Sequence, residues 1–185
     1  MKRWIAYCIA PLLGIAGAIG VIIMMSACAT TANILPPEER IIQETIEVEG
    51  KSKDEIYRDA RIWMVRTFTE SKAVIEYEDK EAGTIAGKGY VKATGKSFKI
   101  AAFAYNVLAE ARATPYIRLT ITIEAKDNRA RITVDQLRMA MKGWGGLGEE
   151  SSIETVELFE EAKIDIQPLI QDFRDYVTTV REEEW

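Results

Sequence analysis

The most regular pattern of apolar and polar residues lies between positions 115 and 137. From residue 117 to residue 124, isoleucine or leucine alternates with threonine or a charged residue. A period of two predicts a strand with one buried face and one face in water. Residues 126–129 have the composition of a hairpin turn, and Ile132 and Val134 continue the alternation beyond it. The pattern therefore predicts an antiparallel hairpin of residues 115–125 and 130–137.

Shorter apolar runs predict four more strands, at residues 41–49, 73–78, 84–94 and 98–111. The last of these is unusually rich in alanine. Gly87 and Gly89 lie inside the third, where they indicate a bulge or the close approach of another part of the chain. Residues 142–148 contain four glycines, so we expect an irregular connection there.

Helical spacing replaces alternation in two regions. Ser52 and Glu55 have the spacing of a capping box, and apolar residues that include Trp63 follow at helical intervals, which predicts a helix from about residue 53 to 70 with Trp63 in the core. Ser151 and Glu154 repeat the capping pattern before an apolar face that continues to residue 177. Pro168 lies inside that face and predicts a kink, or the first turn of a second helix beginning near Asp165.

Together these elements predict an α+β fold. We expect a single two-layer domain over residues 41–185, in which a twisted antiparallel sheet of about five to six strands carries two helices on one face. The order is a strand, a helix, a meander of strands and a C-terminal helical region.

The N-terminal pattern differs from that of the domain. Lys2 and Arg3 precede 24 uncharged residues, 4–27, which end in Ser26-Ala27 directly before Cys28. This arrangement resembles a bacterial lipoprotein signal peptide, whose cysteine becomes diacylated and is then freed as the N-terminus. We therefore expect a signal peptide at 1–27 and a membrane tether at 28–40.

A retained transmembrane anchor is the alternative, because 24 uncharged residues can span a bilayer. Both interpretations place residues 29–185 outside the cytoplasmic membrane, in the cell envelope. Cys28 is followed by Ala29 instead of aspartate. By analogy with lipoprotein sorting in Gram-negative bacteria, that favours a lipid anchor in the outer membrane, facing the periplasm.

Charge and composition exclude several classes of function. The chain has 24 basic and 29 acidic residues, for a net charge of −5, which makes nucleic acid an improbable partner. It has no histidine, and its two cysteines are Cys8 and Cys28. Histidine-dependent catalytic triads and histidine-ligated zinc are therefore excluded. We expect a protein without enzymatic activity, cofactor or bound metal.

Several short motifs resemble the bacterial DUF4468 family, a domain of unknown function with a TBP-like fold. The motifs lie at residues 57–63, 71–75, 79–85 and 87–89. The resemblance covers about residues 41–138 and is strongest at 57–91. It implies the strand–helix–strands layout and an envelope location, and it transfers no activity. The TBP-like description concerns shape alone and is no argument for DNA binding.

Two surfaces are candidates for binding. The first is Trp144 within the glycine-rich segment, either as an aromatic presented to a partner or as a packed side chain. The second is the solvent-facing side of the sheet, which a partner could bind or which could be an ordinary solvated surface. Its basic and aromatic candidates are Lys88, Tyr90, Lys92, Arg118 and Arg131.

The leading hypothesis is a non-enzymatic envelope lipoprotein that binds a protein or a polymer near the membrane. The alternatives are an envelope hydrolase or transferase that uses paired carboxylates, and a purely structural lipoprotein. The acidic pairs considered for the enzyme are Glu76 with Glu78 and Asp79 with Glu81, although charges on edge strands and turns explain them as well.

Overall fold

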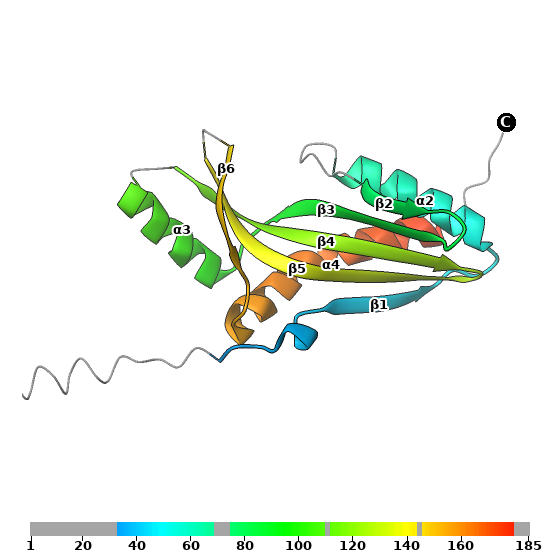
Figure 1. Ribbon diagram of the computed structural model, residues 1–185, viewed down its shortest axis with the longest axis horizontal. Helices are drawn as coiled ribbons and strands as arrows, with labels where there is room; N and C mark the ends of the chain where they lie inside the picture. The colour runs from blue at the N-terminus through cyan, green and yellow to red at the C-terminus, as the bar shows by residue number, and fades with distance from the viewer. Residues whose placement is uncertain (1–32, 69–74, 110–111, 144–145, 180–185) are drawn as a thin grey trace, which may run out of the picture. The chain divides into compact units, whose positions relative to one another are not determined.

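The structure is a computed structural model, and it describes residues 33–68, 75–109, 112–143 and 146–179. The chain divides into two compact units, Met1–Ala32 and Asn33–Trp185, and the description here concerns the second. Its elements appear in Figure 1. They are η1 (Pro37–Glu39), β1 (Ile42–Glu47), α2 (Lys53–Thr67), β2 (Ile75–Asp79), β3 (Thr84–Lys92), α3 (Lys96–Ala109), β4 (Thr114–Lys126), β5 (Arg129–Gly143), β6 (Gly146–Ser152) and α4 (Val156–Thr178).

The strands form one antiparallel sheet in the order β1-β5-β4-β3-β2, with β6 also paired to β5. Strand β5 is long enough to have two partners on the same edge. Its first half pairs with β1 and its second half pairs with β6. A bulge between Asp135 and Arg138 marks the change of partner, and Gln136 within it adopts a left-handed φ of 51°. The α+β class and the antiparallel sheet predicted above are confirmed.

The predicted hairpin is the central pair of this sheet. Strands β4 and β5 are joined through Asp127 and Asn128, and Asn128 has a φ of 61°, as a tight hairpin turn requires. Along β4, every second residue from Pro115 to Ala125 is buried and its neighbours are half-exposed. The period of two in the sequence therefore corresponds to the two faces of the sheet.

Helices α2 and α4 cover the buried face and form the core with it. Ser52 and Glu55 form the predicted capping box at the start of α2. Trp63 is buried, as predicted, with its ring centroid 4.9 Å from that of Phe173 on α4. Its indole N–H donates a 2.7 Å hydrogen bond to Asp172 Oδ2, which satisfies the one polar group of the ring.

Gly89 is explained by the close approach that the sequence suggested. A Cβ atom built on Gly89 would lie 2.6 Å from Phe68 Cδ1, closer than carbon atoms can pack. Phe68 is the C-cap residue of α2 and is buried against β3. A side chain at position 89 would therefore push the end of the helix off the sheet.

Two predictions about the middle of the chain are wrong. The strand predicted at residues 98–111 is a helix as far as the structure describes it, because α3 occupies Lys96–Ala109, and residues 110 and 111 lie outside the described residues. The glycine-rich connection is more regular than predicted, since β5 extends to Gly143 and β6 begins at Gly146. Backbone pairing with β5 holds this segment extended, so its order comes from a neighbouring strand and not from its own composition.

The start and course of the last helix also differ from the prediction. Ser151 lies in β6, and the N-cap of α4 is Thr155, whose hydroxyl accepts a hydrogen bond from the Leu158 N–H. Ile153 between them is fully buried, which holds the chain against the core before the helix begins. Pro168 lies inside one helix that continues to Thr178, so no second helix starts near Asp165.

The expected tether is bonded to the domain over part of its length. Ile34 forms an isolated bridge with Thr155, and the Asn33 carbonyl accepts a 2.9 Å hydrogen bond from the Val156 N–H. Arg40 forms an ion pair with Glu154. The chain therefore enters the domain at Asn33, beside the first turn of α4.

Candidate functional site

The face of the sheet opposite α2 and α4 carries the polar side chains that the sequence singled out. On β3, Lys88 and Tyr90 are half-exposed, and so are Arg118 and Thr120 on β4. The buried side chains of both strands point to the other face. We call the half-exposed side the outer face of β3, β4 and β5.

A row of three side chains crosses this face. Tyr90 on β3 is the register partner of Arg118 on β4, and Arg118 is the register partner of Arg138 on β5. Side chains opposite one another on neighbouring strands lie close enough to interact. The structure therefore brings together two residues named from the sequence, Tyr90 and Arg118, and adds Arg138.

Glu150 on β6 lies beside the two arginines of this row and neutralises part of their charge. Its carboxylate forms ion pairs with Arg118 and with Arg138, whose Nε lies 3.3 Å from Glu150 Oε2. Arg138 also donates a 3.1 Å hydrogen bond from Nη2 to the Glu150 carbonyl. Burial raises the pKa of the Tyr90 phenol, and the nearby Glu150 carboxylate raises it further, so Tyr90 remains neutral and can donate a hydrogen bond.

The other named residues lie farther along the same face. Lys88 pairs with Glu76 at 2.6 Å, and Arg131 pairs with Glu124 at 2.6 Å. Lys92 is exposed, and within the described ranges it belongs to none of these ion pairs. The outer face therefore presents a basic surface, partly neutralised by local carboxylates, on a chain whose net charge is −5. Trp144 and Cys28 lie outside the described residues.

Three of the four carboxylates considered for hydrolysis, those of Glu76, Glu78 and Asp79, have structural partners. Glu78 accepts a 2.8 Å hydrogen bond from Arg61 on α2, in addition to the Glu76–Lys88 pair. Asp79 accepts a 2.9 Å hydrogen bond from the Ala82 N–H, which lowers its pKa and holds the turn before β3. These contacts explain the two pairs as parts of an edge strand and its turn.

A cavity of about 370 Å³ with both polar and apolar lining lies where β5 changes partner from β1 to β6. It is lined by Pro37, Arg40, Ile41, Asp135, Gln136, Leu137, Arg138, Ser152 and Ile153. Burial raises the pKa of the Asp135 carboxyl, whose Oδ1 is buried and has no hydrogen-bond partner among the described residues. Asp135 is the only carboxylate in this lining, so the cavity offers a recess beside the row and not a pair of catalytic carboxylates.

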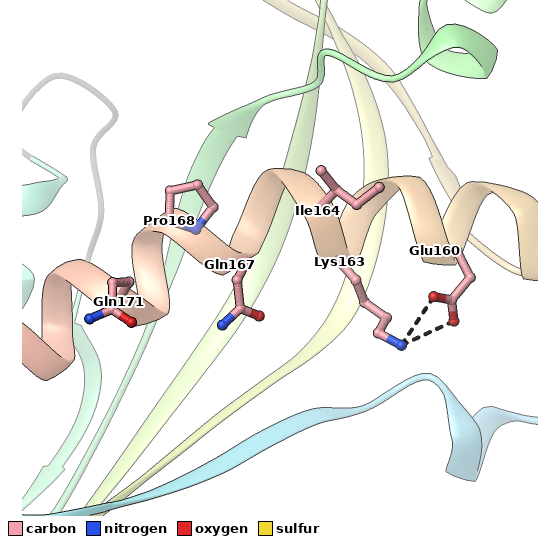
Figure 2. A pocket seen from close by; sticks show the side chains of 6 residues that line it. All are labelled: Glu160, Lys163, Ile164, Gln167, Pro168 and Gln171. Carbon is pink, nitrogen blue, oxygen red and sulfur yellow. Dashed lines mark hydrogen bonds and ion pairs between the residues drawn. The ribbon is translucent and has the colours of Figure 1, made fainter.

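A second hollow follows the surface of α4. It is lined by Glu160, Lys163, Ile164, Gln167, Pro168 and Gln171, which Figure 2 shows along a single helix. Lys163 donates to both carboxylate oxygens of Glu160, at 3.0 and 3.1 Å. The hollow therefore contains no free charge with which to recognise a ligand. Among the residues that the structure describes, no three acidic or thiol side chains converge to hold a metal ion.

Arg138, Glu150 and Asp135 were missed from the sequence. Arg138 follows the bulge at Gln136, which reverses the parity of β5 and moves every later residue to the other face. Glu150 lies between the glycine-rich residues 142–148 and Ser151, where the sequence predicts no strand, whereas the structure places it in β6. One signal in the sequence could have identified them. The segment that forms β5 is longer than any of its partner strands, which indicates that it pairs with more than one strand on the same edge.

The architecture places the chain among α+β proteins with one open antiparallel sheet and helices on one face. The sequence profile of the family described as a domain of unknown function (DUF4468) with TBP-like fold matches residues 43–140. The chain therefore belongs to the DUF4468 family, as its motifs predicted.

Two solved structures share the fold. A DUF4468 family protein from Bacteroides ovatus is 14% identical with a TM-score of 0.51, covering 78% of this chain and 89% of that chain. A TBP-like protein from Parabacteroides distasonis is 16% identical with a TM-score of 0.50, covering 76% of this chain and 94% of that chain. At such identities the likeness concerns the fold alone.

A comparison with curated proteins finds no match. Within the described residues, no helix is both long and apolar enough to cross a bilayer.

Proposed function

We propose that this protein is a non-enzymatic lipoprotein of the cell envelope that binds a protein or polymer on the outer face of its sheet. Cys28 carries the lipid, and the domain lies in the periplasm at the outer membrane. Support for the location comes from the sequence before Cys28, where a basic start, an uncharged run and small residues occur in the order of a lipoprotein signal.

The observation that carries the binding proposal is the row of Tyr90, Arg118 and Arg138 on a face that α2 and α4 leave open. Guanidinium groups bind carboxylates through two parallel hydrogen bonds, and a tyrosine adds an apolar ring with a polar end. With Lys92 beside the row, the face is suited to a partner with an acidic surface. The cavity at Asp135 provides a recess into which part of that partner could fit.

The location is tested by the intact mass of the full chain after expression in a Gram-negative bacterium and extraction from membranes. A mass that begins at Cys28 and includes acyl groups is expected. A mass that begins at Met1 would overturn the lipid anchor in favour of a retained transmembrane segment. Replacing Cys28 by serine should abolish acylation and retain the signal peptide.

Binding is tested by replacing Tyr90 with the photo-crosslinker p-benzoylphenylalanine in the full chain. Irradiation of intact cells should give a discrete adduct with an envelope protein or polymer. Lys92→Glu should weaken that adduct severalfold, because it places a negative charge at the edge of the row. Lys163→Glu makes the same charge change on α4, outside this face, and should leave the adduct unchanged. Equal yields in the two variants would overturn binding on the outer face.

A further inference from the structure

Helix α3 leaves an apolar stripe uncovered. Phe98 and Ala102 are buried, and Ala102 packs with Met141 of β5. On the other side, the exposed fractions are 58% for Ile100, 71% for Phe103 and 62% for Val107. The spacing of these three residues places them on successive turns of one helical face. Scattered exposed apolar residues are ordinary, whereas a continuous stripe that includes a phenylalanine indicates a contact surface.

The charges on α3 indicate what covers the stripe. Lys96 and Lys99 lie in its first turn, and its sequence, KSFKIAAFAYNVLA, has no acidic residue. The chain as a whole has an acidic excess. A helix with lysines in its first turn and an exposed phenylalanine with aliphatic neighbours carries the residue types of helices that lie in the interface of a bilayer, where lysine attracts anionic headgroups.

The position of α3 in the fold places it beside the entry of the N-terminal segment. Ser97 donates a 2.8 Å hydrogen bond from Oγ to Glu157 in the first turn of α4. The preceding residue of α4, Val156, donates its N–H to the Asn33 carbonyl. The start of α3 and the entry of the chain are therefore bonded to adjacent residues of one helix turn.

The length of chain before Asn33 limits how far this turn can lie from an anchor. Four residues lie between Cys28 and Asn33, so the five steps from Cα to Cα can span at most roughly 18 Å when the chain is fully extended. If Cys28 carries acyl chains, the first turn of α4 stays near the headgroups. Helix α3, bonded to that turn, is then within reach of the same surface.

We infer that the stripe of Ile100, Phe103 and Val107 docks on the lipid surface of the membrane that holds the chain. This inference rests on the proposed lipid anchor and deepens it. The anchor supplies proximity, and α3 supplies a second, weaker contact that fixes which side of the domain faces the bilayer. A single lipid-linked residue a few positions before the domain would leave the domain free to rotate about it, and an interfacial helix removes that freedom.

The test uses the full chain with p-benzoylphenylalanine in place of Phe103, expressed in a Gram-negative bacterium and irradiated in isolated membranes. Intact-mass measurement should show an adduct with the mass of one phospholipid. The control places the same crosslinker at Tyr77, an exposed position on β2 with no part in the stripe. That position should give no lipid adduct. Lys96→Glu with Lys99→Glu should lower the lipid adduct at position 103 severalfold, because both charges that attract anionic headgroups are reversed.

The outcomes separate the two proposals. Chains found in the membrane fraction without a lipid adduct at position 103 would overturn the docking of α3 and leave the anchor intact. An adduct of two chains at this position would show that a second copy covers the stripe, and would also overturn lipid docking. Recovery of the full chain only in the soluble fraction would overturn both the anchor and the docking.

Discussion

Helices α2 and α3 have 15 and 14 residues and differ in how they use their apolar side chains. In α2, the largest apolar side chain is Trp63, which is buried between the sheet and α4. In α3, Phe98 is buried and Phe103 is exposed. Figure 1 shows α2 at one end of the sheet, and α3 with β6 at the other. We call the end where Trp63 is buried the closed end, and the end where Phe103 is exposed the open end.

The two helices also differ in what specifies their first turns. Helix α2 begins with its own capping box, formed by Ser52 and Glu55, which are three positions apart in the chain. Helix α3 begins with help from α4, because the Glu161 carboxylate accepts a 3.0 Å hydrogen bond from the Ser97 N–H. Its far end is held by Asn106, which exchanges two hydrogen bonds with Ala113. The first helix is specified locally and the second by tertiary contacts.

The largest predicted effect compares the buried and the exposed aromatic directly. Trp63→Ala should lower the free energy of unfolding by about 4 kcal/mol, because it leaves a cavity and an unpaired Asp172. Phe103→Ala should change it by less than about 0.5 kcal/mol, as expected of an exposed position. Urea unfolding of the full chain in detergent, followed by far-ultraviolet circular dichroism, measures both. A loss at Phe103 comparable to that at Trp63 would contradict the distinction between the closed and the open end.

The second prediction concerns the polar contact that holds the closed end together. Lys51 donates a 2.8 Å hydrogen bond to Asp59 on α2 and a 2.7 Å hydrogen bond to the Val177 carbonyl at the end of α4. Asp59 is buried, so Lys51→Met should cost about 3 kcal/mol by leaving that carboxylate without its cation.

An exposed ion pair on the same helix provides the matched control for Lys51. Lys80 lies 3.9 Å from Asp54, and both side chains are largely in solvent. Lys80→Met should cost less than about 0.5 kcal/mol in the same unfolding measurement. Equal losses of stability for Lys51→Met and Lys80→Met would contradict this prediction. They would show that water reaches the Asp59 carboxylate when α2 and α4 move apart locally.

The third prediction tests how tightly α2 fits the sheet. Gly89→Ala should lower the free energy of unfolding by about 2 kcal/mol, because the new methyl group overlaps the ring of Phe68. Gly143→Ala is the control, since no atom lies within 4 Å of a Cβ built there, and it should be nearly neutral. If Gly89→Ala left the free energy of unfolding unchanged, the ring of Phe68 could move away from β3 without loss of stability, and the predicted tight fit would be wrong.

These contrasts explain how much of the structure the sequence could predict. The β4–β5 hairpin and α2 were predicted because alternation, turn residues and a capping box agree within each segment. The prediction of a strand at residues 98–111 is wrong because alanines fit the period of a strand as well as that of a helix. The residues that hold the start of this helix in place, such as Glu161 on α4, are distant in sequence. Strand β6 was missed because pairing with β5 overrides its glycine content.

The candidate site was predicted in part for the same reason. Tyr90 and Arg118 follow from the alternation along β3 and β4, since both strands are regular there. Arg138 could not be assigned to their face, because the bulge at Gln136 changes the parity of β5. Bulges depend on the partners of a strand, which a single sequence does not reveal.

The smallest predicted effect compares the buried carboxyl of Asp135 with the hydrogen-bonded carboxyl of Asp79. Burial raises the pKa of Asp135, while the hydrogen bond from the Ala82 N–H lowers the pKa of Asp79. A carboxyl whose pKa is raised by folding binds protons more tightly in the native state. Its contribution to stability is present below the unfolded pKa and is lost as the pH rises through the folded pKa. The contribution of Asp79 has the opposite sign and is present at neutral pH.

Asp135→Asn should therefore stabilise the protein at pH 7, by less than about 1 kcal/mol because solvent screens a partly exposed group. The gain should shrink as the pH falls through the pKa of Asp135 and vanish well below about pH 4, where the aspartate is protonated in both states. Asp79→Asn should destabilise the protein at pH 7, and that loss should vanish on acidification. Urea midpoints of both variants across the acidic range measure the two effects. A gain for Asp135→Asn that persisted at low pH would show that the asparagine adds a contact, and that the cavity does not penalise the charge.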